Sequence, residues 1–161
     1  MDQINSASNS GQPETTNDDE MSFEQFLVYS ARCGDKDDVQ EMIDVTGPPV
    51  DLNFRDESMS MNTALHMSSG NGFTEIVKML LKDESRINLN VLNESGNTAL
   101  HYAALNGKKD IVMLLIEKKA DANVKNEFGR IPLEDALQNG HSDIAELLAP
   151  VSKLEDEKIY A

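Results

Sequence analysis

Two of the three histidines are the side chains best suited to bind a metal ion, and each ends one copy of a five-residue string that occurs twice. Asn62-Thr63-Ala64-Leu65-His66 returns 35 residues later as Asn97-Thr98-Ala99-Leu100-His101. A zinc site requires Cys and His ligands at short spacing, and the sequence has no such cluster near either histidine. We therefore interpret His66 and His101 as structural side chains of a repeated unit, and we expect no metal site.

Other patterns that could carry chemistry are incomplete. Cys33, the single cysteine, has no histidine at a spacing that would activate it. Residues 35–38 lack the glycine and the closing glutamate of a calcium loop, so these acids are better explained by the dipole of a helix start. Residues 70–72 are not followed by the Lys-Ser or Lys-Thr of a phosphate-binding loop. We predict that the chain is not an enzyme and uses no cofactor.

Charge is the strongest feature of the composition. The chain of 161 residues has 29 acidic and 14 basic side chains, a net charge of −15, and residues 1–62 alone carry 14 acids against three bases. Such a field repels nucleic acid and attracts Lys- and Arg-rich surfaces, although acidity can also serve only to keep a protein soluble. We expect a basic protein partner, no direct nucleic acid, and a monomer when free.

The chain has no segment suited to a membrane. Its longest apolar run, residues 111–116, is too short to cross a bilayer, and the first twenty residues lack the apolar core of a secretory signal. A single cysteine also precludes an internal disulfide, which fits a reducing compartment. We expect the protein in the cytoplasm and the nucleus.

Helical spacing begins after an acidic, polar tail. Residues 1–21 are too poor in apolar groups to offset the entropy of ordering, so we predict a disordered tail. A helix should begin after Ser22, whose pairing with Gln25 resembles a capping box, and should end at Gly34. A second helix should run through Val39 and Ile43.

The repeated string is part of a longer unit. Each copy is followed by a glycine six residues after the histidine, Gly72 or Gly107, and then by an apolar helical segment. A third, weaker copy covers residues 131–148, and the opening helix pair aligns as an upstream relative. Four such units would form one stack, because a single unit cannot bury its own apolar faces.

A period near 33 residues with a Thr-Ala-Leu-His opening resembles the ankyrin repeats, in which a β-turn precedes two antiparallel helices. The resemblance implies an all-α ankyrin-repeat solenoid of four helix pairs with atypical terminal repeats. The expected repeats cover about residues 22–55, 56–91, 92–124 and 125–149, and a short charged tail follows over residues 150–161.

Two departures from the repeat pattern are informative. Met61 stands where the later copies have the turn glycines Gly96 and Gly129, so the finger between the first two repeats should be irregular. Glu134 replaces the repeated histidine and Ile131 replaces the threonine in the last copy, as expected for a terminal repeat that faces water.

Ankyrin stacks bind partner proteins with their turn fingers and first helices, so the resemblance also implies positions for a binding surface. Phe128 would anchor an apolar side chain of the partner or, alternatively, pack onto the adjacent finger, and the acids would hold Lys or Arg. The expected partner-binding residues are Asp56, Glu57, Met59, Asn62, Glu94, Asn97, Leu105, Glu127, Phe128 and Arg130.

Several strings in joint order resemble a narrower group. The Ser-Ala-Arg-x-Gly-Asp helix pair, the Leu-Asn-Gly-Lys turn and the Asn-x-Phe-Gly finger are similar to those of the fungal ankyrin chaperones dedicated to small-subunit ribosomal protein three. This resemblance implies a chaperone that shields a basic ribosomal protein before assembly. An ankyrin adaptor or inhibitor of a signalling or transcription protein is the alternative.

Overall fold

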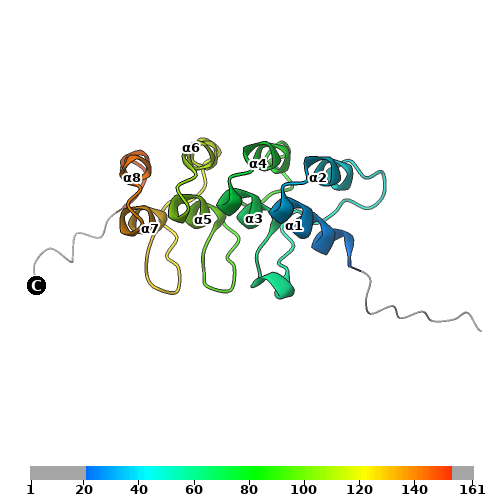
Figure 1. The fold of residues 1–161 in the computed structure, drawn as a ribbon, viewed down its shortest axis with the longest axis horizontal. Helices are drawn as coiled ribbons and strands as arrows, with labels where there is room; N and C mark the ends of the chain where they lie inside the picture. Colours follow the sequence, from blue (N-terminus) through cyan, green and yellow to red (C-terminus); the bar gives the residue numbers. More distant parts are fainter. Residues whose placement is uncertain (1–20, 154–161) are drawn as a thin grey trace, which may run out of the picture.

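The structure, a computed structural model, describes residues 21–153 (Figure 1). The expected tails over residues 1–21 and 150–161 therefore lie outside the described residues, apart from Met21 and residues 150–153. The described part contains eight α-helices and one short 3-10 turn, η1. They are α1 Phe23–Cys33, α2 Lys36–Ile43, η1 Glu57–Met59, α3 Ala64–Asn71, α4 Thr74–Leu80, α5 Ala99–Leu105, α6 Lys109–Glu117, α7 Pro132–Gln138 and α8 Ser142–Leu148.

The helices form two layers. Helices α1, α3, α5 and α7 lie side by side in one layer, α2, α4, α6 and α8 form the other, and the connecting loops project as parallel fingers (Figure 1). Each odd-numbered helix packs on the next odd-numbered helix and on its own even-numbered partner. The predicted all-α solenoid of four helix pairs is confirmed. No helix within residues 21–153 is long and apolar enough to span a bilayer.

The helix ends follow the capping residues of the sequence. Ser22 and Gln25 form the expected capping box at α1, and Gly34 ends that helix in the left-handed conformation with φ 88°. The hydroxyl groups of Thr63 and Thr98 accept hydrogen bonds from the third backbone N–H of α3 and α5. Ile131 has no hydroxyl, and the Glu134 carboxylate instead accepts from the Ile131 N–H at 2.9 Å.

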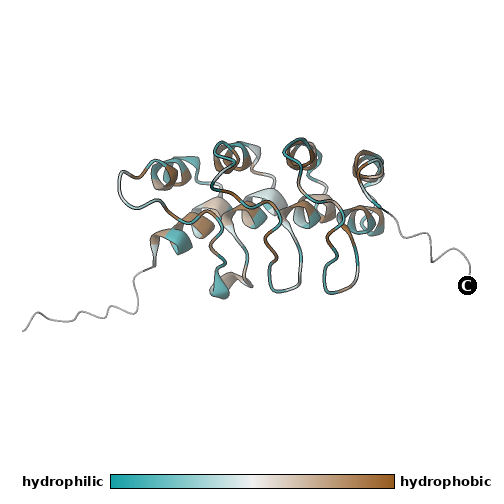
Figure 2. Ribbon diagram, turned by 180° about the vertical axis from the view of Figure 1, so that it is seen from behind, coloured by the Kyte–Doolittle hydropathy of each residue, from teal (hydrophilic) through white to brown (hydrophobic). Residues whose placement is uncertain are grey.

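Residue size explains the two layers. Between the first-layer helices the buried side chains are small, such as Ser69, Ala103 and Ala136, and so these helices approach one another closely. The second-layer helices bury larger side chains, including Ile76 and Leu115. Figure 2 shows hydrophobic residues along the helices of both layers.

The first finger is irregular, as the sequence predicts. Ser60 and Met61 both take left-handed backbone conformations, with φ 54° and 59°, and Met61 stands where the later fingers place Gly96 and Gly129. A side chain in this region costs roughly 1–2 kcal/mol per residue. The turn η1 and the isolated bridge between Asp56 and Asn62 close this longer finger.

Candidate protein-binding surface

One buried side chain near the start of each finger shapes its tip. Asn93 accepts hydrogen bonds through Oδ1 from the N–H groups of Ser95 and Asn97, at 3.1 and 2.9 Å. Asn126 holds the third finger in the same way, and Asp56 accepts from the Ser58 N–H at 2.8 Å in the first. Since each of these side chains is held inside its finger, the residue that follows it is directed to the tip.

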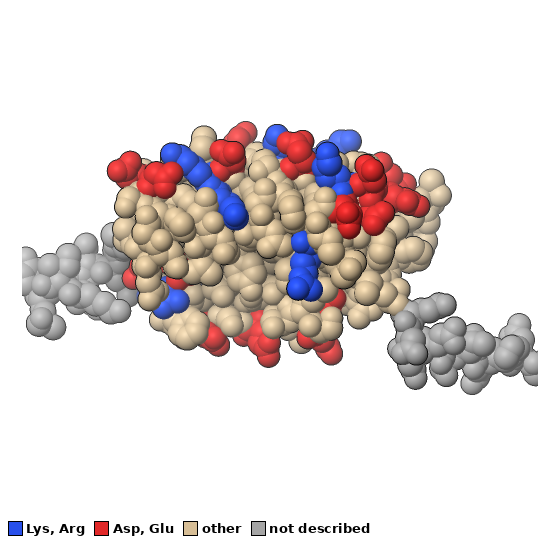
Figure 3. Space-filling model, in the orientation of Figure 1, with Lys and Arg blue, Asp and Glu red and all other residues tan. Residues whose placement is uncertain are grey.

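Backbone hydrogen bonds link the three fingers in register. The Glu94 N–H donates to the Ser60 carbonyl and the Glu127 N–H donates to the Ser95 carbonyl, both at 3.0 Å. Glu94 and Glu127 therefore occupy the same place in the second and third fingers, whereas Glu57 follows the buried Asp56 at the start of η1 in the longer first finger. Glu57, Glu94 and Glu127 are all exposed; we call these three residues the fingertip row. Figure 3 shows acidic side chains along the edge formed by the fingers.

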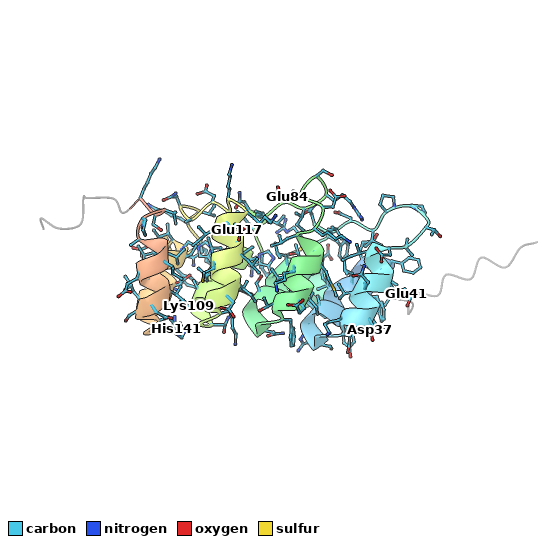
Figure 4. The ribbon with its side chains drawn as sticks, turned by 90° about the horizontal axis from the view of Figure 1, so that it is seen from above. Asp37, Glu41, Glu84, Lys109, Glu117 and His141 are labelled. Atoms are coloured by element: carbon cyan, nitrogen blue, oxygen red, sulfur yellow. The ribbon has the colours of Figure 1, made fainter. Side chains whose placement is uncertain are left out.

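Three acids on the second-layer helices and their loops, by contrast, form ion pairs with lysines. Glu75 pairs with Lys78 at 2.8 Å, Asp143 with Lys109 at 3.1 Å and Glu84 with Lys118 at 2.5 Å. The hydrogen bond from each lysine is the main cause that lowers the pKa of its acid below the ordinary value. Glu84 and Lys109 are labelled in Figure 4, which shows the stack from above.

No member of the fingertip row has an ion pair within residues 21–153. An exposed carboxylate without a cation partner keeps its full charge for an incoming ligand, and it does not have to break an existing pair on binding. The fingertip row therefore places three negative charges at one edge of the stack. Buried side chains and backbone hydrogen bonds hold the fingers that carry them.

The last finger adds an aromatic group and a cation. The Phe128 ring is 64% exposed, and the Arg130 guanidinium lies 4.9 Å from the ring centroid. Arg130 is held there by Asp135, whose Oδ1 lies 2.6 Å from its Nε. Phe128 thus remains mostly exposed rather than buried against the neighbouring finger, which leaves much of its ring available for a contact beside Arg130.

Two residues expected on the binding surface are in fact buried, and this expectation was wrong. Asp56 is 2% exposed and Asn62 is 4% exposed. The Asn62 side chain donates to the Met59 carbonyl and accepts from Asn93 at 2.9 Å, so it joins two fingers instead of facing a partner. The recurrence of Asn or Asp at these positions was a sign of turn-forming side chains.

Other expected positions are half-buried. Asn97 accepts from Asn126 at 2.9 Å, Met59 packs against the core, and Leu105 lies near the end of α5. The exposed Leu137 was not singled out from the sequence. The aligned residues Ser69 and Ala104 are buried, and the terminal place of Leu137 in the stack was the signal that could have shown its exposure.

Comparison with known proteins agrees with the observed architecture. The family described as ankyrin repeats (three copies) matches residues 27–126 and again residues 85–158. The ankyrin repeat-containing protein YAR1 of Saccharomyces cerevisiae is 37% identical over 78 residues, which is 44% of this chain and 39% of that protein. The chain thus spans well under half the length of this relative. The matched positions, the helix pairs and the fingers together show that the chain belongs to the ankyrin repeat family, whose repeats are protein-interaction modules.

Proposed function

We propose that this ankyrin module binds a strongly basic protein at its fingertip row. The single observation that carries this proposal is that Glu57, Glu94 and Glu127, one from each of three adjacent fingers, are exposed carboxylates with no ion pair within residues 21–153. Three carboxylates on adjacent fingers suit a segment with repeated Lys or Arg side chains, because the finger backbones are already held by hydrogen bonds and binding has to order only side chains.

The net charge of −15 supports the same kind of partner. A negative field of this size raises the encounter rate with a cationic protein and lowers it with nucleic acid. Phe128, beside Glu127, offers an apolar contact for side chains that interrupt the basic residues of the partner. The fingertip row and Phe128 together would cover both the charged and the apolar surface of an unassembled protein.

We further propose that the client is a basic ribosomal protein of the small subunit, which the module shields before its assembly, in the cytoplasm and the nucleus. The order of the helix-pair, turn and finger strings described above supports this client, and the match to YAR1 is compatible with it. Ribosomal proteins carry high positive charge for RNA binding, and an acidic protein surface can occupy the same groups until RNA replaces it.

Affinity purification from cell extract at about 50 and 500 mM salt tests this proposal. A small-subunit ribosomal protein should copurify at low salt and be largely lost at high salt, because exposed charge pairs are screened. The purified module should also suppress aggregation of that protein. Recovery of a kinase or a transcription factor without any ribosomal protein would instead support an adaptor or inhibitor.

A further inference from the structure

Met61 stands at a point of the first finger where the backbone conformation favours glycine. Its N–H donates to the Asp56 carbonyl at 2.8 Å. In the second finger, the Gly96 N–H makes the same bond to the Asn93 carbonyl at 3.1 Å. The φ angle is 59° at Met61, 72° at Gly96 and 71° at the equivalent Gly129. The three fingers therefore end in the same turn, and only the first finger carries a side chain at this point.

The side chain of Met61 incurs the left-handed backbone cost that glycine avoids. Two nearby methionines, Met59 and Met67, pack against the hydrophobic core. Met61 is half-buried and is not among the residues in the described part of the chain that pack there. Core packing therefore does not offset the backbone cost. A residue that keeps a sparsely populated conformation without such a gain indicates a role outside the fold.

The turn directs this side chain toward the second finger. Ser60, the residue before Met61, accepts the Glu94 N–H through its carbonyl at 3.0 Å. In the second finger, a Cβ added to Gly96 would lie 3.1 Å from the backbone nitrogen of Glu127. Because Met61 ends the first finger with the same hydrogen bonds as Gly96, its side chain begins beside the backbone of Glu94.

An apolar side chain thus stands beside two of the three acids of the fingertip row. Phe128 follows Glu127 in the chain and is 64% exposed, and Met61 begins beside Glu94. A methionine side chain is unbranched and flexible, so it adapts to apolar groups of different shapes. The edge formed by the fingers therefore offers apolar contacts between its negative charges.

We propose that Met61 is a contact residue for the client and receives an apolar side chain that lies between two basic residues of the bound segment. This inference rests on the proposed function, because it uses the same edge as the fingertip row. The strained backbone at Met61 is retained because the thioether side chain supplies a contact that glycine cannot. The partner is thereby narrowed to a segment that alternates basic and apolar side chains and is not uniformly basic.

Two synthetic peptides of equal charge test this contact. One alternates Arg and Leu, the other alternates Arg and Ser, and fluorescence anisotropy measures the affinity of the full chain for each. Met61→Gly should lower the affinity for the Arg-Leu peptide about threefold or more, because an apolar contact is lost. Its affinity for the Arg-Ser peptide should stay within about twofold of the original, since the fingertip row is unchanged.

Ser60→Gly is the matched control, because Ser60 precedes Met61 and also has a positive φ of 54°. This substitution removes the same kind of backbone cost without removing an apolar side chain, so both affinities should stay within about twofold. Equal losses of Arg-Leu affinity in the two variants would assign the effect to the backbone and would overturn the inference. An unchanged Arg-Leu affinity in Met61→Gly would overturn it as well.

Thermal unfolding separates a partner contact from a structural role. Both glycine variants should have a Tm at least as high as that of the unaltered protein, because glycine adopts a positive φ freely. If the Tm of Met61→Gly is about 3 °C or more below that of Ser60→Gly, the Met61 side chain packs inside the stack and the inference is wrong.

The same measurements distinguish failure of this inference from failure of the proposed function. If the unaltered protein binds neither peptide, the fingertip row is refuted, and the role of Met61 with it. If it binds both peptides and Met61→Gly has no effect, only the role of Met61 is refuted.

Discussion

The imidazole of His66 meets the ring of Tyr102 edge-on in the next repeat, with the ring centroids 5.7 Å apart and the planes at 83°. The Thr63 N–H donates to His66 Nδ1 at 3.2 Å, which leaves Nε2 protonated to donate to the Asn97 carbonyl at 2.8 Å. His101 repeats this arrangement with Thr98 and the Arg130 carbonyl. Both histidines therefore join one repeat to the next in the neutral form.

Acid should weaken the stack through these histidines. Burial is the main cause that lowers the pKa of His66 from 6.5 to about 4, and burial also lowers the pKa of His101. Below pH 6.5 the unfolded chain binds a proton that the folded chain does not, so the free energy of unfolding falls as the pH falls from 6.5 toward 4. At pH 5, His66 alone should account for a loss of roughly 2 kcal/mol relative to pH 7.

Urea denaturation between pH 7 and pH 5 checks this expectation. The variant His66→Gln lacks the titrating group, so its pH dependence should be shallower, and His101 should account for part of what remains. Equal slopes in the two proteins would show that the proton linkage does not come from His66.

The turn glycines should differ in their tolerance of alanine, although they occupy the same place in successive repeats. Gly107 has φ 69°, and a Cβ there would lie 2.7 Å from Cε1 of His141. Gly140 has φ 76° and no neighbouring heavy atom within 4 Å of the same position. Both substitutions incur the left-handed backbone cost of about 1–2 kcal/mol, but only Gly107→Ala must also displace the imidazole. Gly107→Ala should therefore lower the Tm more than Gly140→Ala does; equal losses would contradict the close approach.

Truncation of leucines should separate buried from exposed positions. Leu100 and Leu115 are 1% and 0% exposed, so replacing either by Ala should reduce the free energy of unfolding by roughly 2–5 kcal/mol. Leu137, whose side chain is more than half exposed, is the matched control. Its replacement by Ala should reduce the free energy of unfolding by less. Chemical denaturation of the three variants measures this difference, and a change within about 0.5 kcal/mol at Leu100 or Leu115 would exclude their burial.

Charge reversal should distinguish a specific edge from the general field of the protein. Replacing Glu57, Glu94 and Glu127 together by Lys should lower the affinity for a basic client at least tenfold. The client would lose three attractive contacts and gain three repulsive ones. The control replaces Asp37, Asp38 and Glu41 of α2 by Lys, which changes the net charge equally at another surface.

Binding is measured by titration calorimetry at two salt concentrations, with circular dichroism to check that both variants remain folded. The fingertip row is the binding edge if its variant loses much more affinity than the α2 variant. Equal losses in the two variants would show that only the long-range field acts on the client.

The sequence by itself predicted most of the helix boundaries, because their causes are local. Ser22, Thr63 and Thr98 cap helices through hydroxyl groups close by in the chain, and Gly34 ends a helix by adopting a positive φ. The repeated spacing of apolar residues also predicted the stack, since only neighbouring units could bury those faces. Glu94 and Glu127 were expected at an exposed edge for the same reason, from their equivalent places in the repeat.

Only the tertiary structure decided which polar residues of the fingers face outward. Asp56 and Asn62 are polar and lie in the same finger as Glu57, yet both are buried, because their hydrogen-bond partners include residues of that finger and, for Asn62, of the next one. Burial of Leu89 and exposure of Leu137 likewise depend on whether another repeat follows in space. Local sequence sets the hydrogen-bonding capacity of a side chain, but whether that capacity is used inside the stack or remains available to a partner is set by contacts about one repeat away.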